Sequence, residues 1–413
     1  MRDMVKAFRT LGPYLASFRQ RVFVVALTVR PDDPSFQNLI GDLVFLADAG
    51  IRLVLVFDHR RFLLPEFRAD EAPIDALAEK KHLQAFGEAL ATLGALFYHA
   101  NAPALNMPMT IVAKPKGVVH GIDYGAFGEV RSIETAPFWD NLQKGRMMLV
   151  GRLGFSPVGS TLVLESQEMA KDLAVALSAV KLIYCLPKES MPKTHTSTLT
   201  VKEAKLLALQ DSPCQKYLKN AVQAIEGGVR RVHFLDEAEE GALLSELFTH
   251  LGSGIMVTEN PLGVVRSAKP EDLAAISTLI EPLAQEGLLL ARDKTRLEEE
   301  LQYLYVLDNE GMIIGCAALY PFLEEKAGEF GCFAVHPDFR GEGAGELLLA
   351  SMIEEAQKLG IKRFYALTIK ASHWFVERGF TKATAKDLPK RRQATYDARR
   401  SPHTLVKLLP EKS

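Results

Sequence analysis

Three glycines occur within five residues of the sequence HPDFRGEGAGELLL, which runs from His336 to Leu349. An apolar stretch precedes them, and the stretch that follows has its apolar residues at helical spacing. Glycine weakens both strands and helices, so its repetition here needs a reason. A glycine-rich turn that opens a helix points several backbone N–H groups at one place, where the helix dipole also favours negative charge. This chemistry suits phosphate binding, and a flexible turn is the alternative that the loop alone leaves open.

The composition limits what else the chain can bind. Its 413 residues exceed the size of one hydrophobic core and predict two or more domains. The formal net charge is −2, so no global positive field attracts nucleic acid or an anionic membrane. The four cysteines have neither CxxC spacing nor histidines at metal-ligand spacing, so we expect buried thiols and no metal site. No apolar run reaches membrane-spanning length, and the polar N-terminus does not resemble a secretory signal, so we expect a cytoplasmic protein.

Strands and helices alternate in the first part of the chain. Two runs rich in β-branched residues, at positions 21–29 and 51–57, flank a stretch with helical periodicity. This order predicts a βαβ unit and a parallel sheet. The alternation continues to about residue 256, and Pro261 and Gly263 then predict a domain boundary.

The second part of the chain supplies the elements that position the glycine loop. A strand and a helix come first, followed by a hairpin whose turn is Asn309-Glu310-Gly311. The strand GEFGCFAV then leads into the loop, the loop opens a helix, and a further strand and helix follow. The glycines therefore join a strand to a helix, as a phosphate-binding turn requires.

The hexapeptide from Arg340 to Gly345, RGEGAG, resembles the R/Q-x-x-G-x-G/A signature of the GNAT superfamily of acetyl-CoA-dependent N-acetyltransferases. The resemblance implies that the amides of the loop hold the pyrophosphate of coenzyme A, while the preceding strand offers backbone groups to the pantetheine arm. The residues assigned to acetyl-CoA on this basis are Cys332, Phe333, Ala334, Val335, Arg340, Gly341, Glu342, Gly343, Ala344 and Gly345.

Nearly the whole chain resembles one family, the bacterial N-acetylglutamate synthases. The segments IGCAALYPFLEEKAGEFGCFAVHPDFRG and SHWFVERGF are similar to its catalytic half, and GVRRVHFLDEAEEGALLSELFTHLGSGIMV is similar to the segment that builds its arginine site. The resemblance implies an α/β fold in two parts. Residues 1–258 would form an amino-acid-kinase-like three-layer sandwich with a mostly parallel sheet, and residues 264–413 a GNAT α+β domain with a mixed sheet.

The first part departs from active amino-acid kinases. Those enzymes carry a Gly-Gly pair after their first strand, whereas this chain reads Thr28-Val29-Arg30, and its second strand ends in Asp58-His59-Arg60-Arg61 where a glycine is expected. Bulky side chains at these points would block the close approach of backbone to phosphates. We therefore expect a domain without kinase activity that serves regulation and assembly.

Acetyl transfer to an amine needs a base for the ammonium proton and a donor for the oxyanion. The resemblance assigns the base to Glu329, which lies in the strand before the loop; from its position alone, a solvent-facing glutamate is the alternative. A backbone N–H near Cys332 or Phe333 would face the oxyanion. The acid for the leaving thiolate stays open among Thr368, Tyr365 and Tyr396.

The acceptor implied by the resemblance, L-glutamate, carries two carboxylates, for which arginine is the preferred bidentate partner. Arg292 and Arg400 match glutamate-binding arginines of the family, and Thr368 matches a polar position of the same site. The family often has a serine two residues after the second arginine, where this chain has Pro402, so that edge of the pocket stays open.

A site for free arginine would need an acidic side chain and backbone carbonyl groups that come close to the ligand. Glu246 is the candidate partner, Gly252 and Gly254 would allow the approach, and Tyr14 and Phe18 match aromatic residues that cover the effector in the family. The alternative for the aromatic pair is a helix whose apolar stripe makes a subunit contact.

The sequence therefore predicts an acetyltransferase that makes N-acetyl-L-glutamate from acetyl-CoA and L-glutamate, starts arginine biosynthesis, is inhibited by L-arginine and forms a homo-oligomer. Two alternatives remain: an acetyltransferase with another amine acceptor, and an arginine-sensing binding protein with a vestigial catalytic domain.

Overall fold

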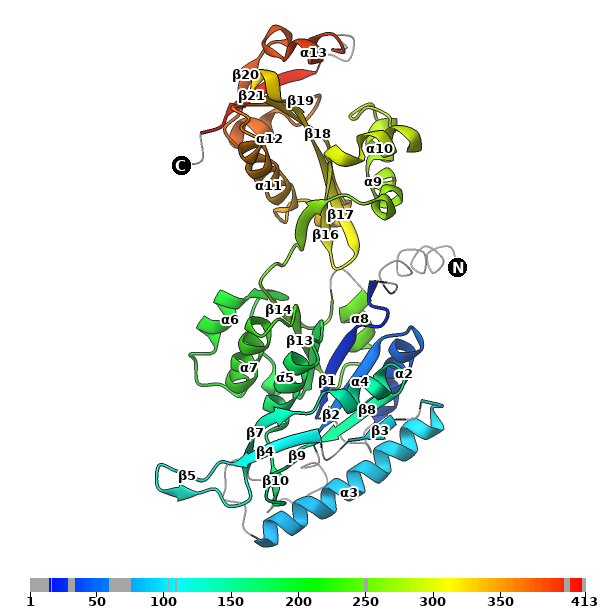
Figure 1. The fold of residues 1–413 in the computed structure, drawn as a ribbon, viewed down its shortest axis with the longest axis vertical. Coiled ribbons are helices and arrows are strands. Elements are labelled where there is room, and N and C mark those ends of the chain that lie inside the picture. The colour runs from blue at the N-terminus through cyan, green and yellow to red at the C-terminus, as the bar shows by residue number, and fades with distance from the viewer. Residues whose placement is uncertain are drawn as a thin grey trace. The chain divides into compact units, whose positions relative to one another are not determined.

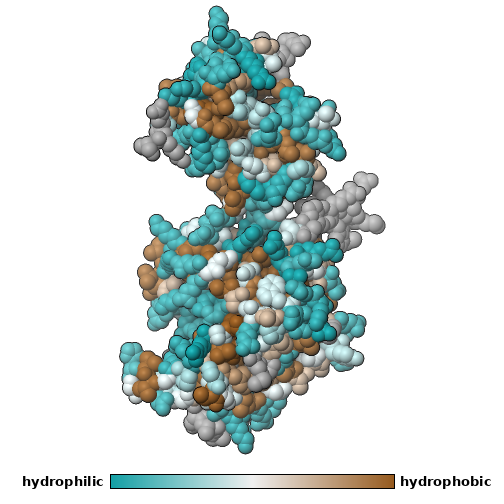
Figure 2. Space-filling model, viewed as in Figure 1, coloured by the Kyte–Doolittle hydropathy of each residue, from teal (hydrophilic) through white to brown (hydrophobic). Residues whose placement is uncertain are grey.

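The computed structural model describes residues 15, 17–28, 34–58, 76–102, 104–107, 110–248, 252–396 and 402–410. The chain divides into two compact units, Met1–Pro261 and Leu262–Ser413 (Figure 1). The sequence predicted a first domain over residues 1–258 and a second over residues 264–413. On the visible face of each unit, polar residues break up the hydrophobic patches (Figure 2). None of the helices in the described ranges is long and apolar enough to cross a membrane.

An eight-stranded sheet forms the centre of the first unit, in the order β12-β14-β13-β11-β1-β2-β8-β3. Its strands are β1 (Val22–Leu27), β2 (Arg52–Phe57), β3 (Ala104–Asn106), β8 (Met147–Gly151), β11 (Lys181–Leu186), β12 (Thr198–Thr200), β13 (Arg231–Asp236) and β14 (Ile255–Thr258). The β13–β14 pairing is antiparallel, and the other neighbouring strands run parallel. The central strands are apolar and buried along almost their whole length, as expected for a parallel sheet covered on both faces.

Helices on both faces of this sheet complete three layers. The helices are α2 (Pro34–Asp48), α3 (Ala76–His99), α4 (Ala136–Leu142), α5 (Ser166–Ala176), α6 (Val201–Leu207), α7 (Gln215–Glu226) and α8 (Ala242–Phe248). Alternate strand residues face opposite layers: Val24 packs in one core with α4–α7, and Phe23 packs in the other with α2, α3 and α8. The predicted fold class of this part is confirmed.

A second, four-stranded sheet of the first unit has the order β10-β9-β4-β7. Its strands are β4 (Ile111–Pro115), β7 (Gly128–Ile133), β9 (Leu153–Phe155) and β10 (Thr161–Val163). The small hairpin of β5 (Val118–Val119) and β6 (Ile122–Asp123) exposes Val118 and Ile122, and a hydrophobic patch lies over it in Figure 2.

The second unit is built on a seven-stranded mixed sheet, in the order β15-β16-β17-β18-β19-β21-β20. Its strands are β15 (Val264–Ser267), β16 (Leu304–Asn309), β17 (Met312–Phe322), β18 (Ala327–Val335), β19 (Arg363–Thr368), β20 (Thr381–Ala383) and β21 (His403–Leu408). Its helices are α9 (Leu273–Gln285), α10 (Lys294–Glu300), α11 (Ala344–Lys358), α12 (Ser372–Glu377) and α13 (Lys390–Gln393). The β18–β19 pairing is parallel, and the other pairings in this sheet are antiparallel. The predicted mixed sheet is confirmed.

The two faces of this sheet carry different helices (Figure 1). Helices α11 and α12 cover one face, where Phe330 and Phe364 belong to their core. Helix α9 covers the other face at one end, over Cys332 and Ala334. At the other end of that second face, Tyr365 and Leu388 form a smaller cluster with Ala327. The catalytic candidate Glu329 lies in the strand at the middle of this sheet.

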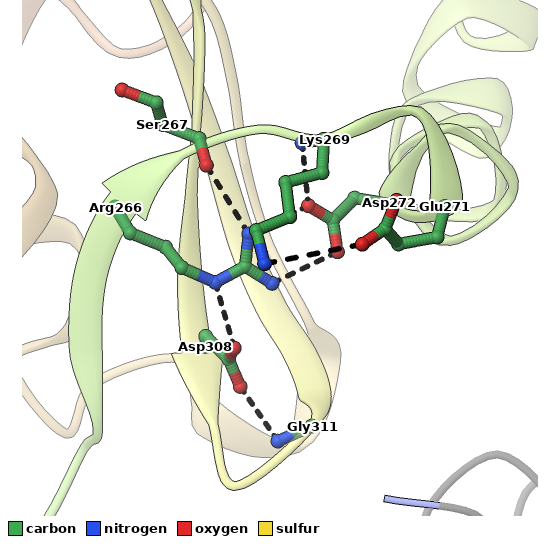
Figure 3. A network of polar contacts seen from close by, with 7 residues as sticks. All are labelled: Arg266, Ser267, Lys269, Glu271, Asp272, Asp308 and Gly311. Carbon is green, nitrogen blue, oxygen red and sulfur yellow. Dashed lines mark hydrogen bonds and ion pairs between the residues drawn. The ribbon is translucent and has the colours of Figure 1, made fainter.

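The start of the second unit is fixed by one arginine (Figure 3). Arg266 of β15 binds both carboxylate oxygens of Asp272, at 2.7 and 2.9 Å, and its Nε donates to Asp308 at 2.8 Å. Burial alone would raise the pKa of Asp272, but the bonds from Arg266 and from the backbone N–H of Lys269 outweigh it and lower the pKa. The predicted hairpin turn lies beside this network, because Asp308 also accepts the N–H of Gly311 at 2.6 Å.

Candidate active site

The glycine loop has a backbone that needs glycine at two positions. Gly341 and Gly343 have φ values of 87° and 93°, a region that L side chains rarely adopt. Gly343 lies immediately before α11, so the first amides of that 15-residue helix open toward the loop. A Cβ at Gly345 would lie 3.1 Å from the rings of Phe333 and Trp374, which leaves little room for a side chain. The loop can therefore present N–H groups to an anion at close range.

Strand β18 changes its pairing where the loop approaches. Its register with β19 ends at the pair Phe330–Ala366, and its register with β17 shifts near Cys332, which has a φ of 47°. The backbone groups of β18 beyond Phe330 therefore have no register partner in β19. They suit an extended ligand lying alongside the strand, as predicted for residues 332–335.

Glu329 lies in a cross-strand row with two tyrosines. Tyr320 of β17 is its register partner on one side and Tyr365 of β19 on the other. The residue is 8% exposed, and its carboxylate is paired with Arg392 of α13. The Nε of Arg392 lies 2.5 Å from Oε2 of Glu329, and its Nη2 lies 3.4 Å from Oε1. Sequence reasoning did not identify Arg392, because a Lys-Arg-Arg run usually indicates a solvated surface.

Arg292, which the sequence assigned to substrate binding, hydrogen-bonds to neighbouring residues beside Tyr320. It donates to Glu300 at 2.8 Å, to the carbonyl of Leu290 at 3.1 Å and to the hydroxyl of Tyr320 at 3.1 Å. Tyr320 in turn donates to Glu300 at 2.6 Å, and Arg296 binds the other oxygen of Glu300 at 2.8 Å. Burial opposes the charge of Arg292, but the neighbouring Cys332, Tyr320 and Glu300 raise its pKa, so it stays protonated. Two guanidinium groups thus share the carboxylate of Glu300.

The three hydroxyl candidates for the acid differ in their contacts. Tyr365 donates to the carbonyl of Asp387 at 2.5 Å, and burial raises its pKa. Tyr396 donates to the carbonyl of Pro402 at 3.4 Å. The hydroxyl oxygen of Thr368 accepts the N–H of Ala371 at 2.9 Å, so its own proton can still be directed at a ligand. Thr368 therefore stays the first candidate for contact with the substrate, and the acid stays open among the three. The predicted Arg400 lies outside the described residues.

The predicted effector residue Glu246 is buried among donors in the first unit. One oxygen binds Nδ1 of His233 at 2.7 Å, and the other accepts the N–H groups of Ser253 and Gly254 at 3.0 and 2.8 Å. Burial alone would raise the pKa of Glu246, but the bonds from His233, Gly254 and Ser253 lower it to about 2. A Cβ at Gly252 would lie 2.4 Å from this carboxylate, so that glycine leaves room for the carboxylate itself.

Lys181 extends this cluster, and sequence reasoning missed it. Its Nζ lies 3.5 Å from Nε2 of His233 and 5.0 Å from the ring centre of Phe18, and the residue is 1% exposed. Within a strand that reads KLIYCL, a lysine at the first position looks like an ordinary solvated strand end. Phe18 is buried beside Lys181 and packs in the hydrophobic core of the first unit, which fits both an aromatic cover and helix packing; Tyr14 lies outside the described residues.

Comparisons with known proteins point to the same family in its catalytic domain and over the full chain. Residues 271–380 match the acetyltransferase (GNAT) family. The amino-acid acetyltransferase of Pseudomonas paraeruginosa is 35% identical, with 99% of this chain and all of the relative aligned. The chain belongs to the amino-acid acetyltransferase family.

Solved structures of the same family extend the likeness to the fold. N-acetylglutamate synthase from Neisseria gonorrhoeae, complexed with coenzyme A and L-arginine, is 32% identical, covers 98% of this chain and 99% of its own, and has a TM-score of 0.83. The same enzyme complexed with coenzyme A and N-acetyl-glutamate has a TM-score of 0.61 at the same identity and coverage. The predicted family, the N-acetyltransferase activity and acetyl-CoA as cosubstrate are confirmed.

In the first unit, the positions where a kinase would bind phosphates include the end of β2 and the residues beside it. Arg152, which follows β8, places Nη1 3.5 Å from Asp58 and Nη2 3.7 Å from Glu165, and its Nε donates to the carbonyl of Leu164 at 2.7 Å. The hydroxyl of Thr28 donates to the carbonyl of Cys185 at 2.7 Å. Val29 and Arg30, together with His59, Arg60 and Arg61, lie outside the described residues. In the ranges that are described, no group of three or more His, Cys, Asp or Glu side chains could hold a metal ion.

Proposed function

We propose that the chain acetylates the α-amine of L-glutamate with acetyl-CoA, forming N-acetyl-L-glutamate as the first step of arginine biosynthesis. The observation that carries the proposal is the position of Glu329. It lies where β18 parts from β19, between a paired arginine on one side and an arginine-rich cluster on the other. An acidic amino acid would find a guanidinium group on both sides of this carboxylate, Arg392 on one and Arg292 on the other.

In this proposal the chain holds acetyl-CoA through its backbone. The residues fit that group because the glycines at 341 and 343 have the positive φ that keeps side chains out of the loop, and because β18 has unpaired register positions beside it. Acetyl-CoA supplies the activated thioester. Loop residues 340–345 bind its pyrophosphate, and residues 332–335 bind the pantetheine arm.

The chain's own groups carry out the proton steps. Glu329 accepts a proton from the ammonium group of glutamate, directly or through a water, and the neutral amine then attacks the thioester carbonyl. The C–N bond forms, the C–S bond breaks, and the thiolate of coenzyme A leaves after taking a proton from an acid that stays open among Thr368, Tyr365 and Tyr396. The backbone N–H of Cys332 or Phe333 donates to the oxygen that becomes negative. Thr368 contacts the acceptor, and Arg292 and Arg400 bind its carboxylates.

Feedback control by L-arginine is the regulatory half of the proposal. The cluster of Lys181, His233 and Glu246 offers both charges that an amino acid recognises, and the Neisseria enzyme was solved with L-arginine. Arginine must bind the less active conformation more tightly to inhibit. We further propose a homo-oligomer in the cytoplasm, a location that fits four free and buried thiols.

An acceptor panel tests the proposal. Release of free coenzyme A is measured with L-glutamate, L-glutamine, L-aspartate, L-lysine and a peptide with a free N-terminus, each with and without L-arginine. We expect L-glutamate to give the highest kcat/KM and arginine to lower the rate. Faster turnover of another amine would replace the acceptor, and the absence of turnover with every amine would favour the vestigial binding protein.

A further inference from the structure

Arg392 occupies the carboxylate that is proposed to act as the base. Both oxygens of Glu329 face its guanidinium group, with Nε at 2.5 Å and Nη2 at 3.4 Å, so an incoming ammonium group has to compete with Arg392 for the same oxygens. The two side chains are 17% and 11% exposed, which places the pair at the rim of the site, within reach of a ligand. This inference rests on the proposed role of Glu329.

The entering acceptor brings carboxylates of its own. Arginine binds carboxylates in a planar, two-bonded geometry, and one carboxylate can replace another with little loss of bonding. Around Glu300 two arginines contact one carboxylate, whereas Arg392 contacts the carboxylate of Glu329 alone. An acceptor with two carboxylates can satisfy both sides.

We propose that Arg392 is a specificity-determining residue that exchanges partners. It pairs with Glu329 while the acceptor site is empty, and it pairs with one carboxylate of the acceptor when glutamate binds, which frees Glu329 to accept the ammonium proton. The same residue thus couples recognition of an acidic amino acid to exposure of the base.

The local structure suits a side chain that changes partner while its backbone stays fixed. Nη1 of Arg392 is held by the carbonyl and the hydroxyl of Thr395, each at 3.2 Å. The segment that carries α13 is tied to the sheet by the bond from Tyr365 to Asp387 and by the N–H of Lys390, which donates to Glu325 at 3.0 Å. A change of partner therefore leaves the helix in place and requires the guanidinium group to turn about, or to give up, its two bonds to Thr395.

The test compares R392Q with a matched control. R391Q removes the same charge from the neighbouring residue of the same short helix, where the side chain is exposed. Each protein is assayed with L-glutamate, with its γ-amide L-glutamine and with its α-amide isoglutamine, and the KM for acetyl-CoA and the Tm are measured alongside.

We expect R392Q to lower kcat/KM for glutamate by roughly 10- to 150-fold, the range for hydrogen bonds to a charged group, mainly through KM. For the one amide that lacks the carboxylate bound by Arg392, the loss on mutation should fall to about twofold or less. R391Q should change glutamate kinetics by less than about threefold, and R392K should recover part of the loss because it keeps the charge without the fork.

Two results would overturn the inference: an unchanged KM for glutamate in R392Q, or the same loss with glutamate and with both amides. Either result together with a lower Tm would make the pair a structural tie between α13 and the sheet. If R392Q does not fold, R392K carries the same comparison, with a smaller but still amide-dependent loss expected. Failure of the proposed function is separate, because it would appear in the unmutated enzyme as no acetylation of glutamate.

Discussion

Replacement of Glu329 by glutamine should separate catalysis from folding. Glutamine keeps the shape of the side chain, and its amide oxygen can still accept a bond from Arg392, now as a neutral acceptor. The stability cost is then the difference between a charged and a neutral hydrogen bond, on the order of 1 kcal/mol. The loss of a positioned base should instead cut kcat by roughly 10²–10⁴-fold, or about 3–5 kcal/mol in the barrier.

The assay measures coenzyme A release with both substrates saturating, and then the KM for acetyl-CoA separately. That KM should change by less than about twofold, because the loop that holds the cofactor opens α11, whose core lies on the opposite face of the sheet from Tyr365 and Tyr320. Glu324→Gln is the matched control, since Glu324 is exposed in the turn before β18. A kcat within about threefold of wild type in E329Q, or equal losses in both variants, would refute the role of Glu329 as base.

Four further measurements test other parts of the molecule. Gly343→Ala and Gly360→Ala both put a side chain at positive φ, so both should lower the Tm, but only Gly343→Ala should raise the KM for acetyl-CoA. Incubation with ATP and N-acetylglutamate should yield no ADP in a coupled assay, and measurable ADP would contradict the interpretation of the first unit. Glu246→Ala should abolish inhibition by arginine and leave uninhibited kcat nearly unchanged, with the oligomer checked by light scattering; persistent inhibition would exclude this site. The pKa of Asp272 is lower in the folded protein than in the unfolded chain, where it is about 4. Its ion pair therefore stabilises the fold fully above about pH 5 and progressively less as the pH falls through 4 and below. The Tm difference between wild type and Asp272→Asn should shrink on acidification.

Local patterns carried most of the fold prediction. The apolar strand, the glycine loop and the amphipathic helix after it lie next to each other in sequence, and the structure has β18, a turn with positive φ and α11 in that order. The hairpin turn at Asn309-Glu310-Gly311 also follows from local chemistry, since Glu310 and Gly311 both have positive φ. Such features need no knowledge of distant contacts, and the sequence is sufficient for them.

The site residues depend on contacts between distant segments, and there the sequence was less informative. Glu329 and Arg392 are 63 positions apart, and nothing near either residue in the sequence indicates the partner. Arg292 was expected to face the substrate, and in the structure it also holds Glu300 and Tyr320, which only the fold brings to it. Lys181 is a similar case, because its burial depends on Phe18 from a segment more than 160 residues away.

The first unit is expected to lack the phosphate site of a kinase. Ligands of parallel α/β sheets usually bind at the carboxyl ends of the strands. Near β2 and β8 this edge is occupied by side chains: Arg152 joins the ends of these strands to the start of α5, and a Cβ at Gly151 would lie 2.4 Å from the ring of Phe86. Opening this edge would separate a buried charge cluster, which is costly when one partner is left unpaired.

The cluster around Lys181 lies at the other edge of the same sheet. Lys181 is the first residue of β11, and the buried Phe18 precedes β1, so both mark the amino ends of parallel strands. We expect an effector bound there to contact Phe18 directly and to leave Arg152 in place. The proposed absence of phosphoryl transfer and the proposed effector site are compatible within one sheet, because Arg152 follows the carboxyl end of β8 whereas Lys181 opens the amino end of β11.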